Sequence, residues 1–255
     1  MKKFIPILLF AITTLFSCNA DKNDTEPQAN IIFNFSHSWD GTPVTNTDFN
    51  QIQYTNENGE VLSISKLRYI ISNIIFTRSN GEDLVFKGYN LVDVTNETNL
   101  AFLLFGTLPL ETYSNVSFTF GLNNEDNAKN YQDLNSASWI VPEMLGGGYH
   151  YMQLEGKFVD NASAETGYAY HVIRAVDNSG PTQVFQDTFF EVDLGEVTIT
   201  NTATFNVEMN IAEWFKNPNT WNLNVLNNML MPNYDAQVMM FQNGQNVFSL
   251  KSVTQ

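Results

Sequence analysis

Histidine and methionine are the residue types in this sequence that best suit metal chemistry. There are three histidines, His37, His150 and His171, and four of the eight methionines lie between Met229 and Met240. Thioether sulfur is a soft ligand that suits Cu(I), and imidazole binds copper in both oxidation states. Methionine also fills irregular gaps in apolar cores, so a packing role for the cluster is the alternative. No histidine belongs to a short motif such as His-Glu-x-x-His, so local spacing gives no sign of a zinc hydrolase.

Motifs for nucleophilic or phosphate chemistry are missing from the sequence. It contains neither a Walker-type phosphate loop nor a Gly-x-Ser-x-Gly nucleophile elbow. Residues 146–148 are three glycines, but they precede an expected strand rather than a helix, which indicates a turn and not a phosphate cradle. We therefore expect that the protein is not an enzyme.

The only cysteine, Cys18, follows a segment typical of a secretory signal peptide. Residues 1–3 include two lysines, residues 4–16 are almost entirely apolar, and a serine precedes the cysteine. The apolar run is shorter than the roughly 20 residues that span a bilayer. Residues 15–18, Leu-Phe-Ser-Cys, resemble the bacterial lipobox, in which the cysteine carries lipid and becomes the mature N-terminus. We expect a signal peptide over 1–17, lipid attached to Cys18, and an outer membrane lipoprotein on the periplasmic or cell-surface face.

The segment after the lipid site is expected to be a flexible tether. Residues 18–30 are polar and acidic, and such a composition cannot bury enough surface to offset the entropy lost on ordering. The acidic residues also resemble the export signal that sends lipoproteins of Bacteroidota to the cell surface. The formal net charge of −15 argues against binding to nucleic acid or to anionic lipid headgroups. Because Cys18 is used for lipid, no cysteine remains for a disulfide or a thiolate metal site.

The elements that must position the histidines are expected to be β-strands. Apolar and polar residues alternate with period two, or form short β-branched and aromatic runs between Asn, Gly, Asp and Pro. Strands are expected over 31–35, 61–64, 67–76, 84–86, 89–94, 99–104, 114–121, 149–158, 167–173, 182–192 and 196–210. This spacing predicts one all-β domain over 31–255, an antiparallel β-sandwich of Ig-like or barrel-like form. Short helices are expected near the C-terminus, over 211–216 and 234–242.

Several short motifs follow one another in an order that is similar to a known family. They are residues 33–37, 54–59, 63–74, 89–93, 118–122, 148–156, 170–171 and 243–250. Together they resemble the MbnP-like family of copper-associated periplasmic proteins and lipoproteins, in a member of Bacteroidota type. The resemblance covers the chain from about residue 31 to its end and implies a β-sandwich-like domain.

The resemblance also implies a site. In the related methanotroph proteins, copper is held by two histidines and by a tryptophan that a dihaem partner oxidises to kynurenine. The histidines that match family positions here are His37 and His171, and Trp139 is the candidate for modification. Residues 138–140 hold a single tryptophan where many relatives have two aromatic positions, which is a departure from the pattern. His150 has no family counterpart, and we expect it to be exposed.

Two hypotheses for function follow. In the first, the protein binds copper without catalysis, through His37 and His171 with Met229 or Met231 as a soft third ligand, and serves in metal acquisition or handling. A dihaem peroxidase-like protein or a TonB-dependent receptor would then be its partner. In the second, the chain is a surface-exposed binding or interaction module of the same fold that has lost its metal. Copper titration distinguishes them.

Overall fold

The computed structural model describes residues 26–255. The expected signal peptide, the lipid site at Cys18 and most of the expected tether lie outside the described residues. Gln28–Ala29 already forms a strand, β1, which pairs with β9 (Leu108–Pro109), and Ala29 is buried. The fold therefore begins before residue 31, within the expected tether. From residue 26 onward, no helix has the length and apolar character needed to cross a membrane.

The larger of the two main sheets has nine strands. They are β4 (Tyr54–Thr55), β5 (Val61–Leu62), β6 (Lys66–Arg78), β7 (Asp83–Asp93), β10 (Thr112–Phe120), β11 (Met152–Val159), β12 (Glu165–Val172), β15 (Phe190–Asp193) and β16 (Val197–Thr198). The order along the sheet is β15-β10-β6-β11-β5-β4, with β7 paired to β6, β12 paired to β11 and β16 paired to β10. All these pairs are antiparallel.

The second main sheet has five strands and contains the single parallel pair of the described chain. Its strands are β2 (Ile31–Trp39), β3 (Thr42–Pro43), β8 (Ala101–Leu103), β17 (Ala203–Asn210) and β18 (Phe248–Thr254). The order is β18-β17-β2-β3, with β8 also paired to β2, and β2 runs parallel to β17. A separate hairpin is formed by β13 (Ala175–Asp177) and β14 (Val184–Gln186).

Helices are short and lie outside the sheets. The α-helices are α1 (Asn124–Asn127), α2 (Gln132–Ser136) and α3 (Tyr234–Gly244), and 3₁₀ helices cover Asn46–Asp48, Glu143–Leu145 and Ile211–Phe215. The two predicted C-terminal helices correspond to Ile211–Phe215 and to α3. Asn233 begins α3 because its side chain accepts a hydrogen bond from the backbone N–H of Ala236.

The core lies between the two sheets and is rich in aromatic rings. In β2, alternation places Ile31, Phe33 and Phe35 on one buried face. Phe33 stacks on Phe205 of β17 at 4.9 Å, and Phe205 meets the edge of Phe76 of β6 at 5.7 Å, which joins one sheet to the other. The predicted all-β antiparallel sandwich is confirmed, with the parallel pair of β2 and β17 as an exception.

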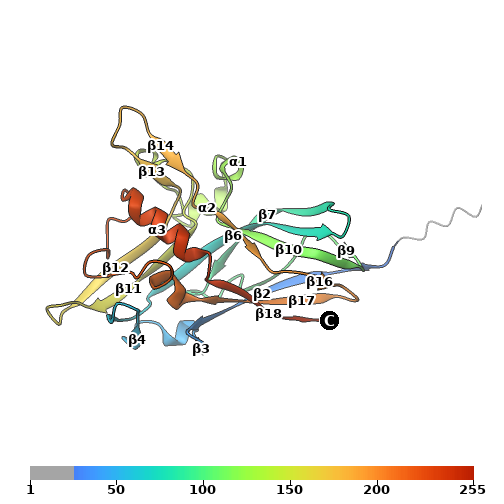
Figure 1. Cartoon of the computed structure of the whole chain (residues 1–255), viewed down its shortest axis with the longest axis horizontal. Coiled ribbons are helices and arrows are strands. Elements are labelled where there is room, and N and C mark those ends of the chain that lie inside the picture. The colour runs from blue at the N-terminus through green and yellow to red at the C-terminus, as the bar shows by residue number, and fades with distance from the viewer. Residues whose placement is uncertain (1–25) are drawn as a thin grey trace, which may run out of the picture.

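The elements are distributed unequally along the molecule. The described chain starts beside β9, at the end that also carries β16 and the C-terminal strand β18 (Figure 1). Strand β12, helix α3 and the β13–β14 hairpin lie in the opposite half (Figure 1).

Candidate metal centre

His171 lies on β12 and points away from the core. Its neighbours Tyr170 and Val172 are fully buried, and successive side chains of a strand point to opposite faces. His171 therefore occupies the outer face of the larger sheet. There it lies in one row with Gln153 of β11 and Arg68 of β6.

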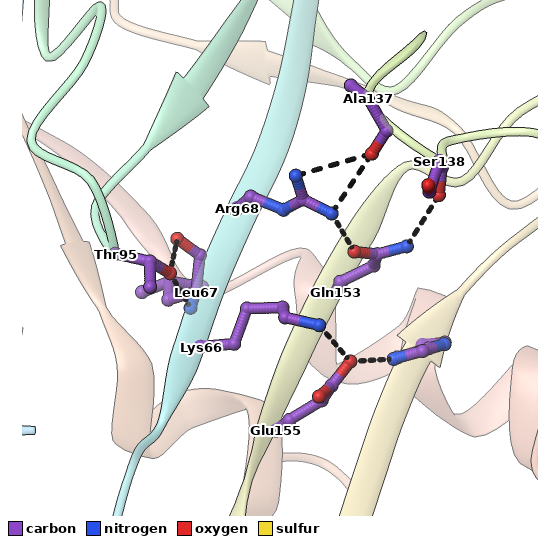
Figure 2. A network of polar contacts seen from close by, with 9 residues as sticks. Lys66, Leu67, Arg68, Thr95, Ala137, Ser138, Gln153 and Glu155 are labelled. Carbon is purple, nitrogen blue, oxygen red and sulfur yellow. Dashed lines mark hydrogen bonds and ion pairs between the residues drawn. The ribbon is translucent and has the colours of Figure 1, made fainter. Parts of the chain in front are cut away.

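A carboxylate fixes the orientation of the His171 ring. Nε2 of His171 lies 2.9 Å from Oε1 of Glu155, and the same oxygen accepts a 2.8 Å hydrogen bond from Nζ of Lys66. Figure 2 shows the link between Lys66 and Glu155 on the neighbouring strands. The hydrogen bond from His171 lowers the pKa of Glu155 to about 2, so this carboxylate is ionised and acts as an acceptor only. We assign the proton of His171 to Nε2, which leaves the lone pair on Nδ1.

His150 lies just before β11 and is almost fully buried, with 5% of its surface exposed. Its Nδ1 is 2.9 Å from the backbone oxygen of Trp139, and a carbonyl can only accept, so Nδ1 must carry the proton. The lone pair of Nε2 is then left without a hydrogen-bond partner anywhere in residues 26–255. Burial lowers the pKa of His150 to about 4, so the ring is neutral near pH 7. The prediction that His150 is exposed is wrong.

The two imidazoles lie close together. The ring centres of His150 and His171 are 5.1 Å apart, with the planes inclined by 83°. When a metal lies about 2.0–2.1 Å from one nitrogen of each ring, at an angle between linear and perpendicular, the ring centres fall about 4.5–6.5 Å apart. The observed separation is within that range. In ligating histidines the second ring nitrogen is usually tied to a carboxylate or a backbone carbonyl, and both arrangements are present here.

Trp139 completes the cluster beside His150. The ring centres of Trp139 and His150 are 5.8 Å apart, and the indole N–H of Trp139 is buried without a partner in the described part of the chain. The guanidinium of Arg68 lies over the indole, 4.9 Å from its centre. Arg68 also donates to the backbone oxygen of Ala137, and Gln153 donates to that of Ser138, so the sheet holds the segment that carries Trp139 (Figure 2).

His37 belongs to a different environment. Its Nε2 shares a 3.0 Å hydrogen bond with the hydroxyl of Tyr69, a fully buried residue of β6 that points into the core. His37 thus lies on the inner side of the larger sheet, whereas His171 lies on the outer side. The expected pairing of His37 with His171 is corrected accordingly, because the sheet separates them and His171 lies beside His150 instead.

The two methionines predicted as soft ligands lie next to His171. Met229 and Met231 line a cavity of about 400 Å³ that reaches His171. The other two methionines of the sequence cluster, Met239 and Met240, are on α3, where Met240 is fully buried in the core. Met239 and Met240 of the sequence cluster therefore pack in or against the core, whereas Met229 and Met231 lie near His171.

The centre is limited to two strong nitrogen ligands. Across residues 26–255, no three side chains drawn from His, Cys, Asp and Glu are arranged to hold one metal ion. A metal at this place would take His150 and His171 and complete its coordination with other groups. Sequence reasoning missed His150, since its position depends on the segment that folds over the outer face of the sheet. Strand alternation alone would place His150 on the same face as Met152, opposite to His171, so no local signal placed it beside His171.

Comparison with known proteins identifies the family of this chain. The family model described as MbnP matches residues 28–238. Among solved structures, MbnP from Methylosinus trichosporium is similar with 11% identity and a TM-score of 0.44, over 71% of this chain and 76% of that chain. A search of curated proteins gave no match. The match to the family model extends over most of the chain, which belongs to the MbnP family.

Proposed function

We propose that this protein binds copper, as Cu(I), between His150 and His171, and that it holds the metal without catalysing a reaction. The observation that carries the proposal is the pair of neighbouring imidazoles, each with one nitrogen hydrogen-bonded and the other carrying a lone pair. The family resemblance implies a site of two histidines and a tryptophan. Trp139, His150 and His171 are a matching set that lies together in space.

The ligand types favour copper over hard cations. Mg²⁺ and Ca²⁺ take oxygen ligands, but Glu155, the carboxylate bonded to His171, is already occupied by His171 and Lys66. Imidazole suits copper, zinc, iron and nickel, and a shortage of further strong donors favours the low coordination number of Cu(I). Because His150 is neutral near pH 7, it needs to lose no proton before it binds.

Burial supports a holding role rather than an enzymatic one. His150 is 5% exposed and lies beneath the segment that carries Trp139. A catalytic metal needs an open coordination position that a substrate can reach. We propose further that the protein is a lipoprotein attached through Cys18 to the outer membrane, on its periplasmic or cell-surface face. Its place is in copper acquisition or handling, with a dihaem peroxidase-like protein or a TonB-dependent receptor as partner.

Competition titration of the full chain tests the proposal. The chain carries Cys18→Ser, so that no thiolate competes, and Cu(I) is titrated against a chromogenic chelator. We expect the double variant His150→Ala, His171→Ala to lose affinity by about a hundredfold or more, because both strong ligands are gone. His37→Gln is the matched control and should stay within about threefold of the parent. Equal affinity of the double variant and the parent contradicts the proposal and favours an interaction module without metal.

A further inference from the structure

The cavity in front of His171 is lined by methionines from two separate segments. Met144 comes from the 3₁₀ helix Glu143–Leu145, and Met229 and Met231 come from the segment before α3. The rest of the lining is apolar, namely Leu145, Ala169, Leu230 and Pro232. We call this methionine-lined cavity the mouth. It connects the surface of the molecule with His171.

Two of these methionines are displayed to solvent. Met144 is 74% exposed and Met229 is 75% exposed, although large apolar side chains usually gain free energy from burial. Met229 has a φ of +53°, in the left-handed region that residues other than glycine seldom adopt. Such conformations cluster at functional sites, where the surrounding structure holds them.

The surrounding structure does hold the segment in place. Leu230 is buried, and its backbone oxygen accepts a 3.1 Å hydrogen bond from the side chain of Gln237 on α3. The same amide group donates to the backbone oxygen of His171 at 2.8 Å, and its oxygen accepts from the N–H of Ile173 at 2.9 Å. Met229 and Met231 flank Leu230, so Gln237 ties both the mouth and the β12 backbone at His171 to one helix.

The chemistry of the lining is selective. A net charge of −15 attracts every cation to the surface, whether hard or soft. The mouth, however, has no carboxylate among its lining residues, so it offers no oxygen side chain for Ca²⁺, Mg²⁺ or Mn²⁺. Its side-chain donors are thioethers and one imidazole, which suit Cu(I).

We propose that Met144, Met229 and Met231 form an outer, weaker Cu(I) site, which captures the ion at the mouth and passes it to His171 and His150. This inference rests on the proposed function of the two histidines. The transfer is an exchange of thioether ligands for imidazole ligands, so Cu⁺ moves without a change of oxidation state. The same apolar surface would also suit a docking protein, and the tests separate the two roles.

The first test measures how fast the inner site is loaded. In the full chain with Cys18→Ser, the triple variant Met144→Leu, Met229→Leu, Met231→Leu keeps the apolar surface and removes only the sulfur atoms. We expect Cu(I) transfer from a weak chelator to slow about tenfold, with the final occupancy unchanged. Met239→Leu, Met240→Leu on α3 is the matched control. Loading of the triple variant at the parent's rate overturns the proposal and leaves docking as the role of this surface.

The second test does not depend on the inner site. In the His150→Ala, His171→Ala background, Ag(I) serves as a redox-inert substitute for Cu(I), and methionine methyl groups are observed by NMR. The methyl signals of Met144, Met229 and Met231 should shift together on titration, whereas those of Met239 and Met240 should not. If the methyl signals of Met144, Met229 and Met231 do not shift, the outer site does not exist, even where the parent chain binds copper tightly. If the parent binds no copper while these signals shift, the proposed inner site alone fails.

Discussion

The rings of His150 and His171 meet edge to face at a separation of 5.1 Å, and each ring is fixed from behind by a different kind of acceptor. A backbone oxygen, that of Trp139, fixes His150, and the carboxylate of Glu155 fixes His171. Both lone pairs are therefore defined by the protein before a metal arrives, which limits the reorganisation that binding requires.

The carboxylate behind His171 gives the first prediction. Glu155→Gln keeps the size of the side chain but removes the charge that orients His171 and strengthens it as a ligand. We expect Cu(I) affinity to fall about 10- to 100-fold, as is typical for the partner of a ligating histidine. Glu165→Gln, on the same strand as His171 but paired at the surface with Lys157, is the control and should leave affinity unchanged. An unchanged affinity in Glu155→Gln would show that this contact does not tune the site.

The buried His37 gives a prediction about pH. Burial lowers its pKa from 6.5 to about 4 in the folded protein, so between these values the unfolded chain binds a proton that the folded chain does not. The free energy of unfolding should therefore be highest above about pH 6.5 and decrease as the pH falls toward 4. At pH 4.5 the free energy of unfolding should be about 2–3 kcal/mol lower than at neutral pH because of this histidine.

His37→Gln separates this effect from the titration of carboxylates, which both proteins share. Urea unfolding of the parent and the variant at pH 7 and pH 4.5 gives a double difference. We expect the stability of the parent relative to the variant to decrease by about 2–3 kcal/mol between pH 7 and pH 4.5. A constant difference at the two pH values would contradict a neutral, buried His37.

Arg68 gives a prediction about the segment over the site. Arg68→Met removes the cation above Trp139 and the donors to the backbone of Ala137. We expect a loss of about 1–2 kcal/mol in stability and greater quenching of tryptophan fluorescence by acrylamide, because Trp139 would loosen from full burial. Arg78→Met, which breaks surface ion pairs with Glu82 and Glu111, should not change quenching. Equal quenching in both variants would contradict the idea that Arg68 holds the segment that carries Trp139.

Gly156 gives a prediction about the sheet. A Cβ at Gly156 on β11 would lie 1.9 Å from the backbone oxygen of Ser63. Gly156→Ala must therefore push the backbone aside, and we expect a loss of about 3 kcal/mol or more. Gly167→Ala on the neighbouring strand is the control, since its nearest atom is 3.9 Å away. The two variants are compared by thermal unfolding. Similar midpoints would contradict the close approach of Gly156 to the backbone of Ser63.

Most of the architecture could be predicted because alternation and turn residues are local signals. The Asn80-Gly81 turn joins β6 to β7 as expected, with Gly81 at a φ of +85°. The break expected between 84–86 and 89–94 does not occur, because β7 continues through Gly88 at a φ of +118°. The parallel pairing of β2 with β17 joins strands far apart in the sequence, and no local pattern encodes it.

The site was only partly predictable for the same reason. The alternation of Tyr170, His171 and Val172 places His171 on the outer face, which the sequence alone supports. Which histidine faces it depends on the pairing of β11 with β12 and on the covering segment that carries Trp139. These are long-range contacts, so His37 and His150 could not be distinguished by their neighbours in the sequence.

The unequal distribution of elements along the molecule has a consequence for encounters at a membrane. The described chain starts beside β9, whereas β12, α3 and the β13–β14 hairpin lie in the other half (Figure 1). If the molecule is anchored at Cys18, as proposed, β12 and with it His171 would lie in the half away from the first described residues. Donors that diffuse in the surrounding fluid would reach this half directly. A receptor in the same membrane would need a projecting loop or domain to do so.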